Sequence, residues 1–125
     1  MAWDLDADRP IYAQLVERIQ KQIVSGYYPP GGKLPSVREL AAVAAVNPNT
    51  MQKAFAELER SGLIVTQRTS GRTVTDNEKL LAETRNLMAR DLVKVFLTGM
   101  KELGFTGQEA ARLLNNKFEG EESNE

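Results

Sequence analysis

The stretch SVRELAAVAAVNPNTMQKAFAELERSG, residues 36–62, decides the fold. Ser36 and Glu39 have the S-x-x-E spacing of a capping box, which predicts that a helix starts there. Asn47 and Pro48 suit the N-cap and the first position of a following helix. Only about three residues separate the two helices, so the stretch predicts a helix-turn-helix.

The flanking segments extend this motif on both sides. Apolar residues recur at helical spacing from Pro10 to Ser25, which predicts a helix before the motif. After it, the β-prone runs 63–66 and 73–75 enclose a polar loop with one glycine, the pattern of a hairpin. Three helices followed by a hairpin predict a mainly α fold with a small β-hairpin, a winged helix-turn-helix.

The rest of the chain predicts two further helices. One runs from about Glu78 to Leu97 or beyond, and Thr106 with Glu109 forms a capping-box pair that opens a shorter one. The apolar stripe of the long helix is too extensive for a lone exposed helix. It packs within the chain or on a second copy, and we favour a homodimer, the commonest assembly. The predicted interface comprises Leu81, Leu87, Met88, Leu92, Val95 and Phe96.

These patterns divide the chain into three parts. Residues 1–76 form the predicted winged helix-turn-helix domain, 77–118 a short two-helix C-terminal dimerisation region, and 119–125 an acidic end that we expect to be disordered. The tail leaves no room for a large effector cavity. A small-molecule effector could bind between its helices or at the dimer interface, and the sequence does not identify one.

The composition excludes several kinds of chemistry. The 125 residues include no cysteine and no histidine, which removes thiolate chemistry, cysteine zinc sites and the commonest general base. Gly31-Gly32-Lys33 lacks the upstream glycine spacing of a phosphate-binding loop. No apolar run approaches the roughly 18 residues that span a bilayer. We therefore expect a cytoplasmic protein that is not an enzyme and holds no metal or cofactor.

The net charge of −1 is unevenly distributed along the chain. Residues 1–75 hold nine Lys and Arg against seven Asp and Glu, a net charge of +2, whereas residues 76–125 hold seven against ten, a net charge of −3. The basic residues between 33 and 72 fit a nucleic-acid surface, and an ordinary mixed surface remains the alternative.

In a helix-turn-helix the second helix enters the DNA major groove with its N-terminal end first. Asn and Gln side chains can pair with adenine, and Lys can reach guanine or a phosphate. The alternative is that these residues only start a helix and face solvent. The predicted contacts from this helix are Asn49, Thr50, Gln52 and Lys53.

Two neighbouring segments complete the predicted DNA surface. Ser36 and Arg38 open the first helix of the pair, where free N–H groups and a guanidinium suit a phosphate. The alternatives are that Ser36 is only a cap and that Arg38 pairs with an acid such as Glu59. In the hairpin, arginines around a glycine suit the minor groove, or form only a solvent-exposed turn. The predicted hairpin contacts are Arg68, Ser70, Gly71 and Arg72.

Three motifs together resemble the GntR family of bacterial transcriptional regulators. They are PIYAQ at 10–14, the G-x-x-L-P-S-x-R-E-L-A pattern at 31–41, and VNPNTMQKAF within 46–64. The PIY start, the NPNT segment and the short tail resemble the YtrA-type subgroup. The resemblance is close over residues 8–75 and rests on size and helical character beyond them.

The resemblance implies a homodimeric repressor of a palindromic operator, often in the regulator's own operon and beside transporter genes. It implies double-stranded DNA as partner and contacts from Arg38, from Asn49, Thr50, Gln52 and Lys53, and from Gly71 in the hairpin. An alternative use of the same fold is a protein-interaction module without specific DNA binding.

Overall fold

The structure is a computed structural model that describes residues 2–69 and 71–123, with side chains described as far as 120. Its elements in chain order are α1 (Ile11–Val24), α2 (Val37–Ala44), α3 (Pro48–Arg60), β1 (Ile64–Gln67), β2 (Gly71–Val74), α4 (Glu78–Glu102) and α5 (Gly107–Ser123). The chain forms two compact units, Met1–Arg85 and Asn86–Glu125.

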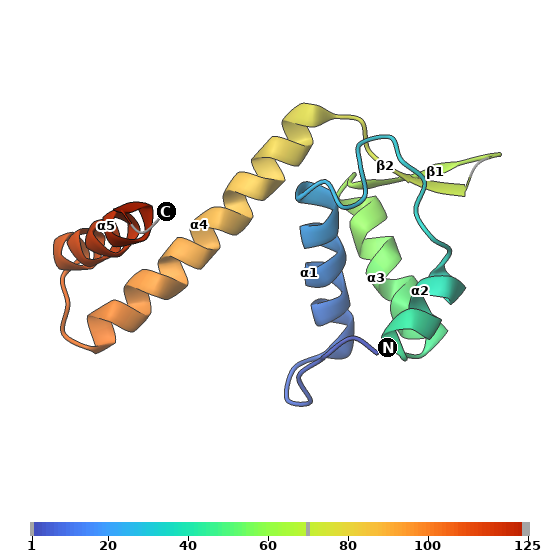
Figure 1. The fold of residues 1–125 in the computed structure, drawn as a ribbon. Coiled ribbons are helices and arrows are strands. Elements are labelled where there is room, and N and C mark those ends of the chain that lie inside the picture. The colour runs from blue at the N-terminus through green and yellow to red at the C-terminus, as the bar shows by residue number, and fades with distance from the viewer. Residues whose placement is uncertain (1, 70, 124–125) are drawn as a thin grey trace. The chain divides into compact units, whose positions relative to one another are not determined.

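The first unit is the predicted winged helix-turn-helix. Helices α1 and α2 both pack against α3, and the antiparallel hairpin β1–β2 follows α3 directly (Figure 1). Side chains from all three helices and both strands fill one core, in which Phe55 is the largest fully buried residue. The α3 members of this core are Met51, Ala54, Phe55 and Leu58, the stripe that the sequence pattern predicts.

Local capping fixes the ends of the two central helices. Ser36 and Glu39 form both hydrogen bonds of the capping box, with the Glu39 N–H donating to the Ser36 hydroxyl at 3.1 Å. Asn47 is the N-cap of α3, and its side-chain oxygen accepts the Asn49 N–H at 2.8 Å. Both predicted helix starts are therefore confirmed.

The turn between α2 and α3 depends on Ala45. Its backbone is left-handed, with φ 60° and ψ 48°, and it is the one non-glycine residue with positive φ among the residues described. The Val46 N–H reaches back to the Ala41 carbonyl at 3.0 Å, which closes the helix end. This residue sets the direction in which α3 leaves α2, at a conformational cost of about 1 kcal/mol for a residue with a Cβ.

An N-terminal strap, residues 3–9, lies along α1. Gln14 is buried and holds the strap by its backbone: it accepts the Asp6 N–H at 2.7 Å and donates to the carbonyls of Asp6 and Arg9. The Arg18 guanidinium lies 4.5 Å from the ring centre of Trp3. Gln14 of the PIYAQ motif therefore has a structural role that the sequence pattern did not reveal.

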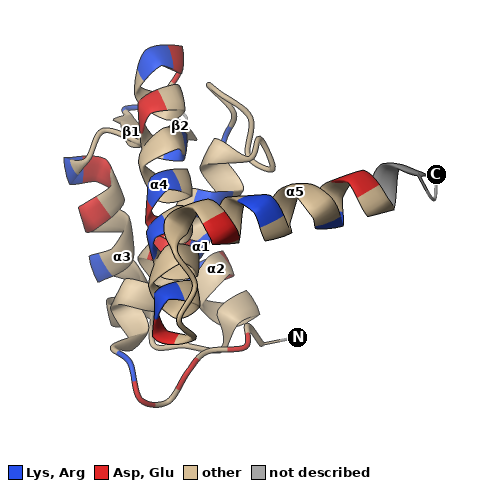
Figure 2. Ribbon diagram, turned by 90° about the vertical axis from the view of Figure 1, so that its left-hand side faces the viewer, with Lys and Arg blue, Asp and Glu red and all other residues tan. Residues whose placement is uncertain are grey.

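The second unit consists of the later part of α4 and of α5. Gly104, with φ 94°, ends α4, and the Thr106–Glu109 capping box opens α5 as predicted. The structure differs from the sequence prediction at the C-terminus, where α5 continues to Ser123, into the 119–125 segment for which the sequence predicts disorder. Glutamates at 119, 121 and 122 have good helix propensity, which accounts for the extension. Figure 2 shows that charge of both signs is spread along α5.

The boundary between the units also differs from the predicted one after residue 76. The first two turns of α4 belong to the first unit, because Leu80 and Leu81 pack against its core. A Cβ on Gly62, which has φ 88°, would lie 3.2 Å from a Leu80 methyl group. Leu81, predicted to lie in a dimer interface, thus packs partly on the core of its own chain and is half-buried. A seven-residue spacing does not show which surface a stripe covers.

Ala45→Gly should raise the free energy of unfolding by about 1 kcal/mol, because glycine adopts the left-handed conformation without a Cβ clash. The matched control is Ala42→Gly, an exposed position inside α2, which should lower stability by about 1 kcal/mol. Urea denaturation of both variants checks this. A loss of stability in Ala45→Gly would show that the turn is not strained.

Candidate nucleic-acid interface

The N-terminal turn of α2 presents Arg38 to solvent. Its guanidinium forms no ion pair or hydrogen bond within residues 2–69 and 71–123, so it is available to a ligand. The alternative of an Arg38–Glu59 ion pair is wrong, because Glu59 bonds Arg72 instead. Ser36 acts as the helix cap, and its hydroxyl lies at the same exposed helix start.

The N-terminal end of α3, residues 48–53, which we call its leading edge, directs its polar side chains outward. Asn49, Gln52 and Lys53 are exposed, whereas Met51 and Ala54 between them are buried in the core. Thr50 differs from its neighbours because it is half-buried and lines a hollow with Trp3 and Leu5 of the strap. The first turn of α3 carries no charged residue (Figure 2), so contact there would come from amides and backbone N–H groups.

The hairpin β1–β2 forms the wing. Gln67 pairs with Gly71 at its end, and Gly71 has φ 76°, a conformation that favours glycine. Arg68 in the connecting turn is exposed and has no partner in the described part of the chain. Ser70, the remaining predicted contact in this turn, lies outside the described residues. Arg68 and Gly71 therefore share one end of the wing.

Arg72 has a partner that the sequence analysis did not predict. Its Nε donates to the Glu59 carboxylate at 2.7 Å, and its guanidinium lies 5.5 Å from the ring centre of Phe55. Glu59 also accepts the Thr66 hydroxyl at 3.0 Å. The Arg72 hydrogen bond holds the pKa of Glu59 below its ordinary value. These contacts fasten the wing to α3, so Arg72 has a structural role whether or not it touches DNA.

Lys33 is a basic residue that the sequence analysis did not include in the site. Residues 31–34 pair with the outer edge of β2: the Leu34 N–H donates to the Arg72 carbonyl at 2.9 Å, and Lys33 forms a bridge with Thr73. The Lys33 side chain thereby lies beside Gly71, with its Cε 4.0 Å from the position of a Cβ there. No local signal reveals this placement, because it depends on pairing between segments about 40 residues apart.

Ion pairing leaves an excess of positive charge on this part of the molecule. Arg60 pairs with Glu57 and Arg72 with Glu59, and Glu39 is occupied by the α2 cap. All three acidic residues between 33 and 72 are thus engaged locally. Among the described residues of that segment, the basic side chains without an acidic partner are Lys33, Arg38, Lys53 and Arg68.

The second unit has a different surface. Ala110 is its one buried residue among those whose exposure is described, and large apolar side chains are open to solvent. Of the predicted interface residues, Met88 is half-buried and the others in this unit are exposed: Leu87, Leu92, Val95 and Phe96. Their exposure ranges from 39% for Phe96 to 71% for Val95. Exposed apolar side chains of this extent are typical of protein–protein interaction surfaces.

A capped helix pair with a polar leading edge, a basic wing and unpaired cations defines the class of winged helix-turn-helix DNA-binding domains. Within the described residues no helix meets the length and apolarity of a membrane span, and no cluster of potential metal ligands occurs.

Comparison with known proteins identifies the family. Residues 11–74 match the model of the bacterial regulatory proteins of the gntR family. The chain is 36% identical to the HTH-type transcriptional regulator YhcF of Bacillus subtilis over 91% of this chain and 94% of YhcF. It is 41% identical to the HTH-type transcriptional repressor YtrA of Bacillus subtilis, over 73% and 71% of the two chains. The protein belongs to the GntR family of transcriptional regulators and is similar to its YtrA-type members.

Solved structures agree with this assignment. A GntR family transcriptional regulator from Listeria monocytogenes superposes with a TM-score of 0.82 at 38% identity, covering 90% of this chain and 98% of the other. The DNA-binding domain of AraR in complex with operator ORX1 superposes with a TM-score of 0.54 at 28% identity, covering 60% and 95%. The relatives are DNA-binding regulators rather than enzymes, as the sequence predicted.

Glu59→Gln should lower the free energy of unfolding at pH 7 by about 0.5–1 kcal/mol, the range for a partly exposed ion pair. Because the pKa of Glu59 is lowered in the folded state, this stabilisation is present above the unfolded pKa. It is lost as the pH falls below about 5 and through the folded pKa. Denaturation from pH 7 to pH 3 should therefore show the two proteins converging. In an Arg72→Gln background the same substitution should cost less, and an undiminished cost would contradict the ion pair.

Proposed function

We propose that the protein is a homodimeric repressor that binds a palindromic operator through its first unit. The observation that carries this proposal is the set of four unpaired cations, Lys33, Arg38, Lys53 and Arg68, around the exposed leading edge of α3. Each can neutralise a phosphate and release a counterion, so the domain attracts DNA although the whole chain has a net charge of −1.

The polar residues of α3 would recognise the base sequence of the operator. With the N-terminal turn of α3 in the major groove, Asn49 and Gln52 can each pair with an adenine edge, and Lys53 can reach a guanine or a phosphate. Thr50, half-buried against the strap, is suited to a contact at the edge of this surface. Ser36 and Arg38 would meet a phosphate at the start of α2, where the helix dipole adds positive potential.

The wing would contact the neighbouring groove. Arg68 and Gly71 lie at its end, and Lys33 adjoins them from the 31–34 segment. A narrow minor groove has a strong negative potential that attracts an arginine side chain, and a glycine permits close approach of the backbone to the DNA. Ser70 belongs to the same turn. For Arg72 we propose the supporting role, because its guanidinium is held by Glu59.

Dimerisation would come from the second unit. Two copies that pair through the exposed apolar side chains of α4 and α5 would remove these side chains from water. The dimer would then carry two DNA-binding units that can occupy one operator together. The two-fold symmetry of such a dimer makes the operator palindromic, and we expect its half-sites one helical turn, about 34 Å, apart from centre to centre. The repressor role follows the named activity of the similar YtrA of Bacillus subtilis. Control of the protein's own operon and of neighbouring transporter genes, in the bacterial cytoplasm, completes the proposal.

Sequencing of the genomic fragments that the purified protein selects tests the function directly. We expect an enriched site with two-fold symmetry, upstream of a small number of genes, including the protein's own. Binding to that site should persist at moderate salt and weaken steeply as salt rises. Equal micromolar affinity for every fragment would contradict a specific regulator and favour a protein-interaction module.

Arg38→Ala should weaken binding to the selected site by about 1–3 kcal/mol per contact. If Arg38 meets a phosphate, the slope of log affinity against log salt should fall by about 1 for each protomer; if it reads a guanine, discrimination against a mismatch at one position should be lost. Arg60→Ala is the matched control, because Arg60 pairs with Glu57 at the far end of α3. Equal affinity of Arg38→Ala and the parent protein would reject the contact.

Leu92→Lys should convert the dimer to a monomer. Leu92 is 67% exposed within the chain, so a lysine there costs the isolated protomer little while placing a charge in the proposed apolar interface. Sedimentation should give twice the 13.9 kDa chain mass for the parent and the single chain mass for the variant. Glu83→Lys, an exposed change in the part of α4 within the first unit, should remain dimeric. A monomeric parent would contradict the proposal.

A further inference from the structure

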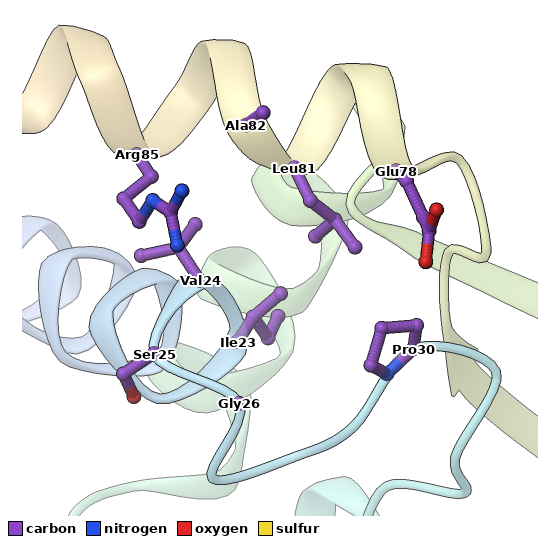
Figure 3. A pocket seen from close by; sticks show the side chains of 9 residues that line it. All are labelled: Ile23, Val24, Ser25, Gly26, Pro30, Glu78, Leu81, Ala82 and Arg85. Atoms are coloured by element: carbon purple, nitrogen blue, oxygen red, sulfur yellow. The ribbon is translucent and has the colours of Figure 1, made fainter.

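A cavity of about 380 Å³ lies within the first unit, where the end of α1 meets the first turns of α4. The end of α1, the loop after it and one face of α4 all contribute to its lining (Figure 3). None of the residues assigned above to DNA contact lines it. The cavity is therefore separate from the DNA-reading surface.

The middle of the cavity is apolar. Ile23 forms the floor and is 2% exposed, and Leu81 points toward it from α4 (Figure 3). Val24 and Pro30 extend the apolar lining on either side. An aliphatic segment placed here would cover this apolar surface and lose water from the side that faces it, which is the favourable part of binding.

The two ends of the cavity carry opposite charges. Glu78 points toward the Pro30 side and Arg85 toward the Val24 and Ser25 side (Figure 3). They are seven positions apart on α4, so their Cα atoms lie about 10 Å apart along the helix axis. Neither side chain has an ion-pair or hydrogen-bond partner among the residues that the structure describes. The two side chains form no ion pair with each other, and both remain available to a ligand.

We propose that this cavity binds a small zwitterion whose ammonium and carboxylate groups lie about 10 Å apart on an aliphatic or apolar middle. The ammonium would meet Glu78, the apolar middle would cover Ile23 and Leu81, and the carboxylate would meet Arg85. Long ω-amino acids and short apolar peptides with free termini share this chemistry. A ligand with one charge leaves one end of the cavity unmatched and binds less tightly.

Occupancy of the cavity would also affect DNA binding, a step that rests on the proposed function. The bound molecule would join the end of α1 to the first two turns of α4, and α4 then continues as one helix into the second unit. A ligand that fixes the contact between the end of α1 and the start of α4 would change the free energy with which the two DNA-binding units of a dimer occupy one operator. The cavity is thus an effector site for the regulator.

Amide NMR of the uniformly ¹⁵N-labelled full chain tests the site without DNA. The probes are 8-aminooctanoic acid, trileucine, octanoic acid and octylamine. Both zwitterions should give saturable shifts centred on Ser25, Gly26 and Arg85, with dissociation constants of about a few millimolar, as befits small ligands. Octanoic acid and octylamine should bind at least about fivefold more weakly, because each lacks one charge match.

Variants locate the binding. Glu78→Gln and Arg85→Gln should each weaken both zwitterions at least about fivefold. Glu83→Gln and Arg90→Gln, on α4 but outside the lining, should leave binding unchanged. The site is refuted by an absence of saturable shifts, by shifts centred elsewhere, or by equal binding of single-charge probes or of the pocket variants. Dissociation of a dimer by the zwitterions would show that a second copy covers the groove, which also refutes it.

Operator binding with and without 8-aminooctanoic acid tests the coupling. A change in operator affinity of at least about threefold, absent in Glu78→Gln, supports the effector role. Saturable binding with unchanged operator affinity refutes that role and leaves the site. Saturable binding by a protein that selects no DNA refutes the proposed function and leaves the site, so the two failures are distinguishable.

Discussion

Burial of Phe55 is the constraint on which the rest of the DNA-reading unit depends. Its ring belongs to the core formed by α1, α2, α3 and the hairpin, and it is the largest of the fully buried side chains. Because Phe55 must face inward, the rotation of α3 about its axis is fixed, and the polar residues at the start of the helix must face outward. The same ring lies beneath the Arg72 guanidinium, which Glu59 holds in place. One buried side chain thus sets both the reading edge and the attachment of the wing.

The sequence predicted what local chemistry controls. The caps at Ser36, Asn47 and Thr106 each satisfy backbone N–H groups within a few residues, so their spacing was enough to place three helix starts. Together with the apolar stripe of α3, the caps also predicted the exposure of Asn49, Gln52 and Lys53, whereas Thr50 is half-buried by the strap, which the local pattern did not indicate. The positions of the two strands shifted by only a residue or two.

Long-range pairing accounts for what the sequence did not reveal. The sequence pattern of residues 31–34 indicates only a glycine-rich loop. It is the pairing of this segment with β2 that brings Lys33 to the wing. The sequence pattern does not distinguish Arg72 from the other arginines of the hairpin, although its guanidinium is hydrogen-bonded to Glu59, thirteen positions earlier in the chain. Leu81 belongs by spacing to the stripe of the second unit but packs on the core of the first. In each case two or more partners compete for a side chain, and tertiary structure decides between them.

The two units differ in how their stability arises. The first unit buries a continuous apolar core, so it has a source of folding free energy within one chain. The second unit buries only Ala110 among its residues of described exposure, while Leu103 is 75% exposed and Leu92 67%. Helices joined only by a short turn gain little from burying so small an area. If a second copy covers these side chains, most of the folding free energy of this unit is gained on association, and its stability then depends on protein concentration.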